Sequence, residues 1–207
     1  MREPTTKRAT GEANARRAFT LVETLVAIAI LALAIAGPLY TADRTLVATE
    51  LAREQLTATY LAQEGIEYVR ALRDNAYLSA YQAGGTSVSA NAWSAFLSSP
   101  VSQCVNSACT ADPWFTPPGL PSWWFGTLQA CTVGSTCTPL YFDGGSAPSY
   151  SGAIYSQRVT SVETPYTRTV QFYAVSPNDE RVVATVTWDF HGTTERAIVT
   201  DQLTPWQ

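Results

Sequence analysis

The sequence predicts an α+β fold, in which one long, kinked N-terminal helix packs on a small antiparallel sheet near the C-terminus. Three observations support this prediction. A helical pattern of apolar residues runs from Phe19 to about Asn75. Strand-like alternation of apolar and polar residues marks the region 153–207. The stretch between them, 76–152, is rich in Gly, Pro, Ser and Thr, which predicts turns and irregular structure.

Residues 1–18 are polar, basic and without periodicity, which is typical of a leader peptide. They carry a net charge of +3, whereas the rest of the chain carries −7. A basic segment before an apolar run stays on the cytoplasmic side of a membrane. The remainder contains no lysine, because Lys7 is the only one, and it offers no basic face for nucleic acid.

The first half of the helix, 19–40, is apolar on every side. At about 1.5 Å per residue it is about 30 Å long, the thickness of one hydrocarbon core. Glu23 is the one carboxylate within it. Burying such a charge in a bilayer costs about 2.5–3.5 kcal/mol, so Glu23 should have a partner and a task. Gly37 and Pro38 predict a kink rather than an end, because the helical pattern resumes after them.

The second half of the helix is amphipathic, with a stripe of mostly small residues that allows another element to approach closely. The stripe consists of Ala48, Leu51, Gln55, Ala58, Ala62, Gly65, Val69 and Leu72. Charged residues lie mainly off this stripe, which is typical of a solvated helix face.

All four cysteines lie in the segment that follows the helix. An even number of cysteines in an exported chain predicts two disulfides, and of the three possible connectivities we favour the local pairs Cys104–Cys109 and Cys131–Cys137. Their spacing lacks the C-x2-C form of a zinc site, so no metal or cofactor is expected.

The same segment carries an aromatic cluster and one possible short helix over residues 91–97. The aromatic side chains either fix the loop over the sheet, which we favour, or form an exposed adhesive patch. They are Trp114, Phe115, Trp123, Trp124 and Phe125.

The C-terminal region predicts an antiparallel meander with one buried face. Turns are expected at 176–179 and 191–194, and Ile154 to Val162 can add a further strand. The predicted buried set alternates along two strands and comprises Val170, Phe172, Ala174, Val182, Ala184, Val186, Trp188 and Phe190.

The sequence offers little for catalysis, and we expect no enzyme activity. An enzyme needs a convergent set of acid, base or nucleophile. The single histidine, His191, falls in a predicted turn, where solvation is its ordinary role. The acidic residues at 143–145 and 178–180 lack the spacing of a calcium loop and are explained by turn chemistry.

The segment from Ala18 to Ile28, Ala-Phe-Thr-Leu-Val-Glu-Thr-Leu-Val-Ala-Ile, resembles the start of a type IV pilin or pseudopilin. The tract Leu61 to Arg70, Leu-Ala-Gln-Glu-Gly-Ile-Glu-Tyr-Val-Arg, resembles minor pilins of the PilV-like kind. This chain has Ala18 where that family usually has glycine. The resemblance implies the pilin fold and a structural role in a filament.

The resemblance also implies roles for individual residues. Prepilin peptidase would cut between Ala18 and Phe19, and the new amine of Phe19 would be methylated. Glu23 would pair with the Phe19 amine of a neighbouring subunit, and so set the stagger of assembly. The helix would anchor the subunit in the inner membrane and then pack in a pilus or a periplasmic pseudopilus. The implied partners are other pilins, prepilin peptidase and a membrane assembly platform, with adhesion, motility, DNA uptake or secretion as the purpose.

Two alternatives stay open at this level. Glu23 can instead be protonated and hydrogen-bonded within its own helix. Arg16-Arg17-Ala18-Phe19 also fits the core of a twin-arginine export signal, with cleavage after Ala34-Ile35-Ala36. In that case the product would be a free periplasmic domain with Gly37 as its mature N-terminus. With an ordinary signal peptide, or with the apolar run kept as a single-pass anchor, the chain would be an exported periplasmic or a membrane-anchored binding domain.

Overall fold

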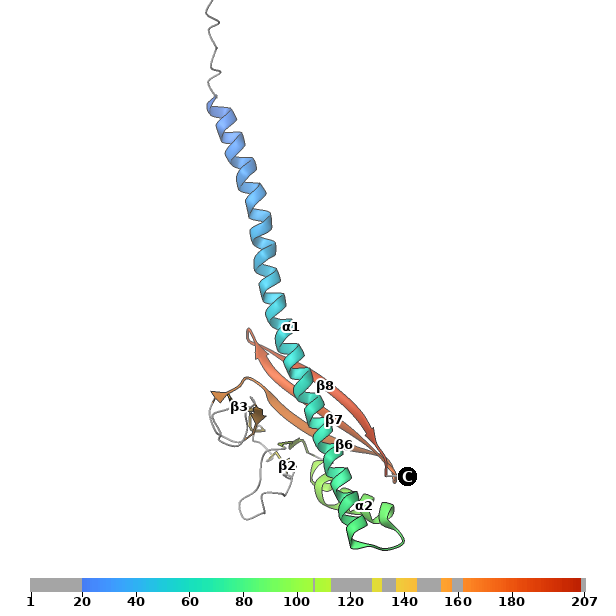
Figure 1. The fold of residues 1–207 in the computed structure, drawn as a ribbon. Coiled ribbons are helices and arrows are strands. Elements are labelled where there is room, and N and C mark those ends of the chain that lie inside the picture. Colours follow the sequence, from blue (N-terminus) through green and yellow to red (C-terminus); the bar gives the residue numbers. More distant parts are fainter. Residues whose placement is uncertain are drawn as a thin grey trace, which may run out of the picture. The chain divides into compact units, whose positions relative to one another are not determined.

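The computed structural model describes residues 20–105, 107–112, 128–131, 137–144, 154–157 and 162–205. The chain divides into two units, Met1–Thr49 and Glu50–Gln207. Helix α1, Leu21–Ala83, contributes to both units. The second unit, which we call the head, holds the remaining elements (Figure 1). The predicted class, a long N-terminal helix with small antiparallel sheets, is confirmed.

Helix α1 continues through Pro38, as the sequence predicts. The hydroxyl of Thr41 donates a hydrogen bond to the Pro38 carbonyl oxygen at 2.9 Å, within the turn that follows the proline. A bend at this point stays a prediction. The helix ends at Ala83, beyond the predicted end near Asn75. Its stop signal is Gly84, whose φ of +76° is the left-handed conformation common just after a helix.

The main sheet of the head has five strands in the order β2-β1-β6-β7-β8. Strands β6, β7 and β8 form a long antiparallel meander, while β1 and β2 are short. The bounds are Cys109–Thr110 for β1, Gln129–Ala130 for β2, Thr167–Ser176 for β6, Asp179–Phe190 for β7 and Thr193–Leu203 for β8. Both predicted turns of the meander are present.

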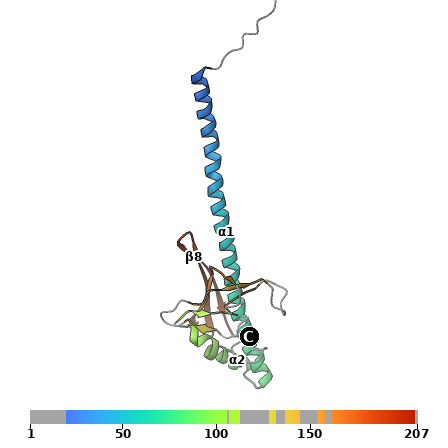
Figure 2. The ribbon, with the colours of Figure 1, turned by 90° about the vertical axis from the view of Figure 1, so that its left-hand side faces the viewer.

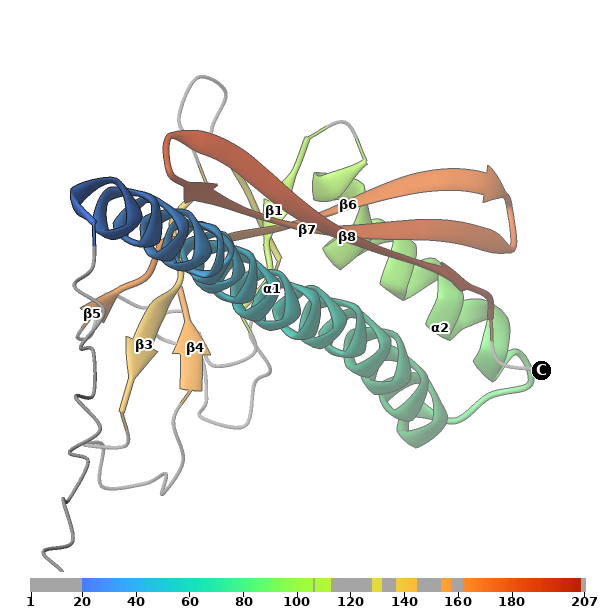
Figure 3. The same cartoon turned by 90° about the horizontal axis from the view of Figure 1, so that it is seen from above.

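A second sheet has three strands in the order β4-β3-β5. It lies beside the main sheet in the view along α1 (Figure 3). The bounds are Tyr141–Asp143 for β3, Ile154–Ser156 for β4 and Val162–Glu163 for β5. The single further strand predicted from Ile154 to Val162 is therefore wrong in detail, because β4 and β5 each pair separately with β3.

The core of the head lies between α1 and the inner face of the β6–β7–β8 sheet. Alternate β7 side chains, from Val182 to Trp188, are buried as predicted. On the helix, Ala58, Ala62 and Val69 are fully buried. The predicted stripe was wrong at Ala48 and Gln55, which are exposed, and it omitted the buried Leu61, Ile66 and Tyr68. Ala174 of the predicted sheet face is also exposed, because it lies next to the irregularity in the β6–β7 register.

The segment after α1 contains a short helix, α2 (Val88–Phe96), in the region where one was predicted. α2 lies beside the last turns of α1 (Figure 2). A π-helical turn, η1 (Leu97–Val101), and a 3-10 turn, η2 (Ser102–Cys104), follow it. The indole N–H of Trp93 donates to the Pro177 carbonyl oxygen at 2.9 Å, and this bond ties α2 to the β6–β7 turn. The aromatic cluster from Trp114 to Phe125 lies outside the described residues.

Candidate functional site

The N-terminal end of α1 is capped by Thr20. The Thr20 hydroxyl oxygen accepts a hydrogen bond from the backbone N–H of Glu23 at 3.3 Å. The Thr20 carbonyl oxygen accepts the first helical bond, from Thr24 N–H at 3.2 Å. Thr20 therefore satisfies one of the amide donors that a helix start leaves free.

Glu23 occupies the first turn of α1, and its side chain is exposed. Thr20 and Glu23 stand three residues apart in the capping-box pattern, Thr-x-x-Glu. A carboxylate in a first turn is also stabilised by the positive end of the helix dipole. Sequence reasoning missed this local role, although the pattern was visible. Ala18 and Phe19, the predicted processing residues, lie outside the described residues.

The side chains of residues 20–50 are all exposed, although most are apolar. Leu21 is 75% exposed and Leu33 is 76% exposed. A continuous apolar surface of this kind is rare on soluble monomeric proteins, because its contact with water is unfavourable. Within the described residues, α1 is the one helix long and apolar enough to cross a membrane, by length and composition. This surface therefore calls for lipid or for other protein helices.

In the head, a fully buried guanidinium, that of Arg168 on β6, joins three segments of the chain. Its Nη1 donates to the Leu61 carbonyl oxygen at 3.2 Å and to Glu64 Oε2 at 2.6 Å. Its Nη2 donates to the Ala111 carbonyl oxygen at 2.6 Å. A buried charge is tolerated when it is paired and hydrogen-bonded in this way. Arg168 thus links α1, the sheet and the segment after β1, and sequence reasoning did not single it out.

Gly65 makes room for this arrangement. A Cβ atom placed there would lie 3.3 Å from Cδ of Arg168 and 3.6 Å from Cβ of Ala184. The small residue in the predicted stripe therefore permits close packing of α1 on the sheet. Nearby, burial raises the pKa of the Tyr68 hydroxyl; the Asp112 carboxylate adds to this rise, and Arg168 opposes it.

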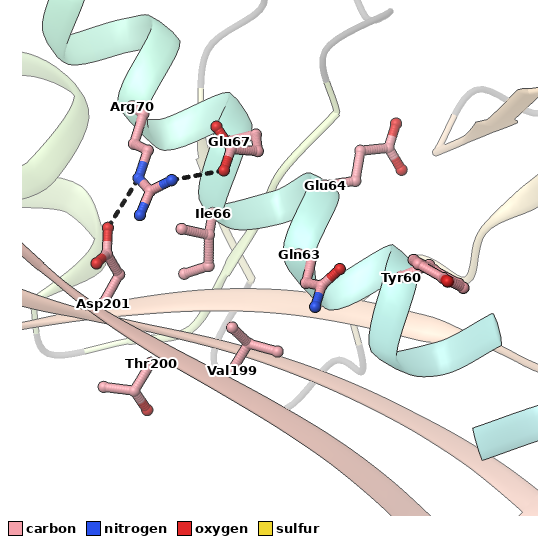
Figure 4. A pocket seen from close by; sticks show the side chains of 9 residues that line it. All are labelled: Tyr60, Gln63, Glu64, Ile66, Glu67, Arg70, Val199, Thr200 and Asp201. Carbon is pink, nitrogen blue, oxygen red and sulfur yellow. Dashed lines mark hydrogen bonds and ion pairs between the residues drawn. The ribbon is translucent and has the colours of Figure 1, made fainter. Parts of the chain in front are cut away.

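A surface groove of about 440 Å³ lies between α1 and β8 in the head (Figure 4). Arg70 crosses its end: its Nε lies 2.9 Å from Asp201 Oδ2, and its Nη1 lies 2.6 Å from Glu67 Oε1. The hydrogen bond to Asp201 raises the pKa of Arg70 above its ordinary value. The spacing of Arg70 and Asp74 predicts an i,i+4 ion pair, and this prediction is wrong, because Asp74 pairs with Arg73 while Arg70 pairs with Glu67 and with Asp201 of β8.

The cysteines form the two local disulfides, Cys104–Cys109 and Cys131–Cys137. Cys104 and Cys109 are fully buried and join η2 to β1. Cys131 and Cys137 are half-buried and close a short loop after β2. The first bridge is therefore part of the core, while the second joins two half-buried residues after β2.

The described residues contain no group of three or more His, Cys, Asp or Glu side chains that could hold a metal ion. His191 is exposed in the β7–β8 turn, where its φ is 52°. Its ring contacts Phe190 edge-on at 4.4 Å between centroids. The geometry places His191 in a tight turn, against the Phe190 ring.

Comparison with protein families matches residues 13–37 to the prokaryotic N-terminal methylation motif. No curated protein and no solved structure matches the chain. The matched residues include Ala18, Phe19 and Glu23, and they end at Gly37. The motif supports a type IV pilin-like or pseudopilin subunit, which is a structural protein. The apolar helix fits membrane anchoring before assembly.

Proposed function

We propose that this chain is a minor pilin or pseudopilin, processed by prepilin peptidase between Ala18 and Phe19 and assembled through α1 into a filament. The observation that carries the proposal is the methylation motif at the start of a helix whose side chains, most of them apolar, are all exposed from Leu21 to Glu50. Before assembly lipid covers that surface; afterwards the helices of other subunits cover it. The head then faces outward from the filament.

Glu23 is the residue that we assign to assembly. In a dry helix bundle, an ionised Glu23 and the free amine of Phe19 are each poorly solvated. Bringing Glu23 of one subunit to the Phe19 amine of the next pairs both charges. A wrong stagger leaves a charge buried without a partner, at a cost of about 3–5 kcal/mol. The pairing therefore acts mainly on the register between subunits.

Helix capping is the alternative role for Glu23, and two substitutions separate it from assembly. Glu23→Gln keeps a side chain that can cap but removes the charge, because Gln serves in a capping box as Glu does. Glu23→Ala removes both. If pairing sets the register, both variants are cleaved, stay in the membrane and fall by about a hundred-fold or more in the filament fraction.

The measurement is quantitative immunoblotting of membrane and sheared-filament fractions. Glu50→Gln is the matched control, because Glu50 is an exposed carboxylate on the same helix beyond the motif. It should assemble as the wild type does. Normal incorporation of Glu23→Gln, with loss only in Glu23→Ala, would assign Glu23 to capping and overturn the pairing.

A further inference from the structure

The outer edge of strand β8 takes no part in the proposed assembly through α1. β8 lies at one end of the five-stranded sheet, and among the described residues only β7 pairs with it. It spans Thr193–Leu203, whereas the strand at the opposite edge, β2, spans only Gln129–Ala130. A long row of free backbone N–H and C=O groups is a template for pairing with another chain.

The turn between β7 and β8 shows which backbone groups face outward. His191 and Gly192 both have positive φ, 52° and 81°, which defines a two-residue type I′ turn closed by Phe190 and Thr193. Hydrogen-bonded and non-hydrogen-bonded pairs alternate along an antiparallel ladder. The closing pair, Phe190 and Thr193, is a hydrogen-bonded pair, so the next pair along the ladder is not hydrogen-bonded. In every non-hydrogen-bonded pair, the backbone N–H and C=O groups of the β8 residue point away from β7. These residues are Thr194, Arg196, Ile198, Thr200 and Gln202.

This edge lacks the features that usually block pairing. Proteins protect such edges with prolines, bulges or several charges. β8 contains no proline, and its register with β7 runs without a shift. The outward-facing residues are all exposed; Arg196 is the one charged residue among them, and Ile198 is 51% exposed.

The groove of Figure 4 lies on the inner side of the same edge. Val199 and Asp201 reach it from β8, and Ile66 and Glu67 reach it from α1. A strand added beside β8 would place every second side chain over this groove. The edge supplies hydrogen bonds, and the groove supplies contacts for alternate side chains, which is the arrangement used in strand addition.

We propose that the free edge of β8 and this groove dock an extended segment of a different subunit of the filament, which joins the sheet as a further strand. The proposal rests on the proposed function. Apolar Ile66 and Val199 favour a small or β-branched side chain above them. Of the three carboxylates that line the groove, Glu64 is paired with Arg168, while Glu67 and Asp201 share the single guanidinium of Arg70, which leaves one negative charge unmatched. The docked segment should therefore carry a Lys or Arg at an inward-facing position.

A second copy of this chain fits the edge less well. Antiparallel pairing of β8 with β8 of a second copy over its whole length centres on Ile198. That register sets Glu195 of each copy opposite Asp201 of the other. Like charges directly opposite each other destabilise a sheet. A different subunit, whose segment supplies a basic residue, meets the same groove without this repulsion.

The test uses the full chain in cells that assemble filaments. Thr200→Pro removes an outward-facing N–H and leaves the ladder to β7 intact, because proline is tolerated on an edge whose N–H faces away. We expect processed protein with unchanged melting temperature and a filament fraction at least about ten-fold below wild type. The control Thr200→Ala keeps the N–H and should assemble normally. Equal incorporation of Thr200→Pro and wild type overturns the proposal.

Hydrogen exchange gives a second readout. In sheared filaments, the amides of Arg196, Ile198 and Thr200 should exchange at least about ten-fold more slowly than in detergent-extracted subunits. Equal rates would contradict strand addition. A dimer of the purified chain that Thr200→Pro dissociates would instead assign the edge to a second copy and overturn the choice of partner. Failure of the proposed function is distinguishable, because the wild type itself would then be absent from filaments.

Discussion

The two halves of helix α1 share one backbone geometry but differ in what surrounds their side chains. From Leu21 to Glu50 every side chain is exposed, although most are apolar. Between Ala58 and Val69, seven residues are buried in the head. The second half is therefore held by packing within its own chain, as most protein helices are. The first half exposes an apolar surface that fits membrane anchoring before assembly, and the methylation motif, residues 13–37, overlaps it.

Mutations in the two halves of α1 should therefore have different effects. Substitutions in the head should change the free energy of unfolding and leave membrane association alone. Substitutions in the first half of α1 should change assembly and leave unfolding of the head alone. This separation can be tested on the detergent-extracted full chain, with unfolding followed by near-ultraviolet circular dichroism of its tryptophans.

The largest effect is expected from Arg168→Ala. This change leaves the carbonyl oxygens of Leu61 and Ala111, and the carboxylate of Glu64, without their donor. Removing one partner of a buried ion pair typically costs about 3–5 kcal/mol of unfolding free energy. Arg73→Ala is the control, because the Arg73 side chain is 20% exposed and pairs with the neighbouring Asp74. If Arg168→Ala lowers the free energy of unfolding by less than about 1 kcal/mol, Arg168 does not stabilise the head by linking α1 to the sheet.

The next effect should come from the Cys104–Cys109 disulfide. Replacing both residues with Ala removes a short cross-link, worth about 2 kcal/mol, and buried sulfur atoms as well. The same replacement of Cys131 and Cys137 removes a link of similar length from a half-buried site. Urea titrations should therefore give a larger loss for the first pair. Equal losses would show that packing adds nothing to that bridge.

Gly65→Val should destabilise the head by about 1–3 kcal/mol, because a branched side chain there overpacks the contact with Arg168 and Ala184. Gln63→Val is the matched control: it introduces the same residue at an exposed position of the same helix. Thermal unfolding should distinguish the two variants. Helix propensity alone would favour Gly65→Val over Gly and disfavour Gln63→Val, so a Gly65→Val variant that loses no stability would contradict the packing account.

The smallest effect is expected at Glu180, and it is a gain. Burial, and secondly the nearby Asp179 carboxylate, raises the pKa of Glu180 above its ordinary value of 4.5. Because the folded state favours the protonated acid, the chain loses stability as pH rises from 4.5 through the folded-state pKa. Glu180→Gln should therefore be slightly more stable than wild type at neutral pH. The difference should vanish below pH 4.5, and a constant difference across pH would contradict the account.

The sequence predicted well what depends on local pattern. The length of the apolar run, the period-two strands from Val170 to Trp188 and the local cysteine pairs all follow from residues close together in the chain. Gly65 was placed correctly on the packing face, because a stripe of small residues is visible as a period. The end of α1 was placed too early at Asn75, since Gly84 was not weighed as a stop signal.

What the sequence did not reveal depends on contacts between distant segments. Arg168 sits in a strand as an ordinary alternating residue, and only the fold brings its guanidinium to Leu61 and Ala111. The same holds for Arg70, whose partner Asp201 lies on β8, and for the groove beside them. The free edge of β8 follows from strand order, which alternation alone cannot determine. Glu23 differs, because its capping pattern with Thr20 is local and was simply overlooked.

The N-terminus of the mature protein tests the central claim most directly. Intact mass and N-terminal sequencing of the chain purified from membranes should give Phe19 as the first residue, with one methyl group on its amine. That result would place Glu23 near the start of the mature helix, where it can meet the amine of a neighbour. A mature chain beginning at Gly37 would mean that the apolar run is a discarded export signal. It would contradict the assignment of this protein to a filament.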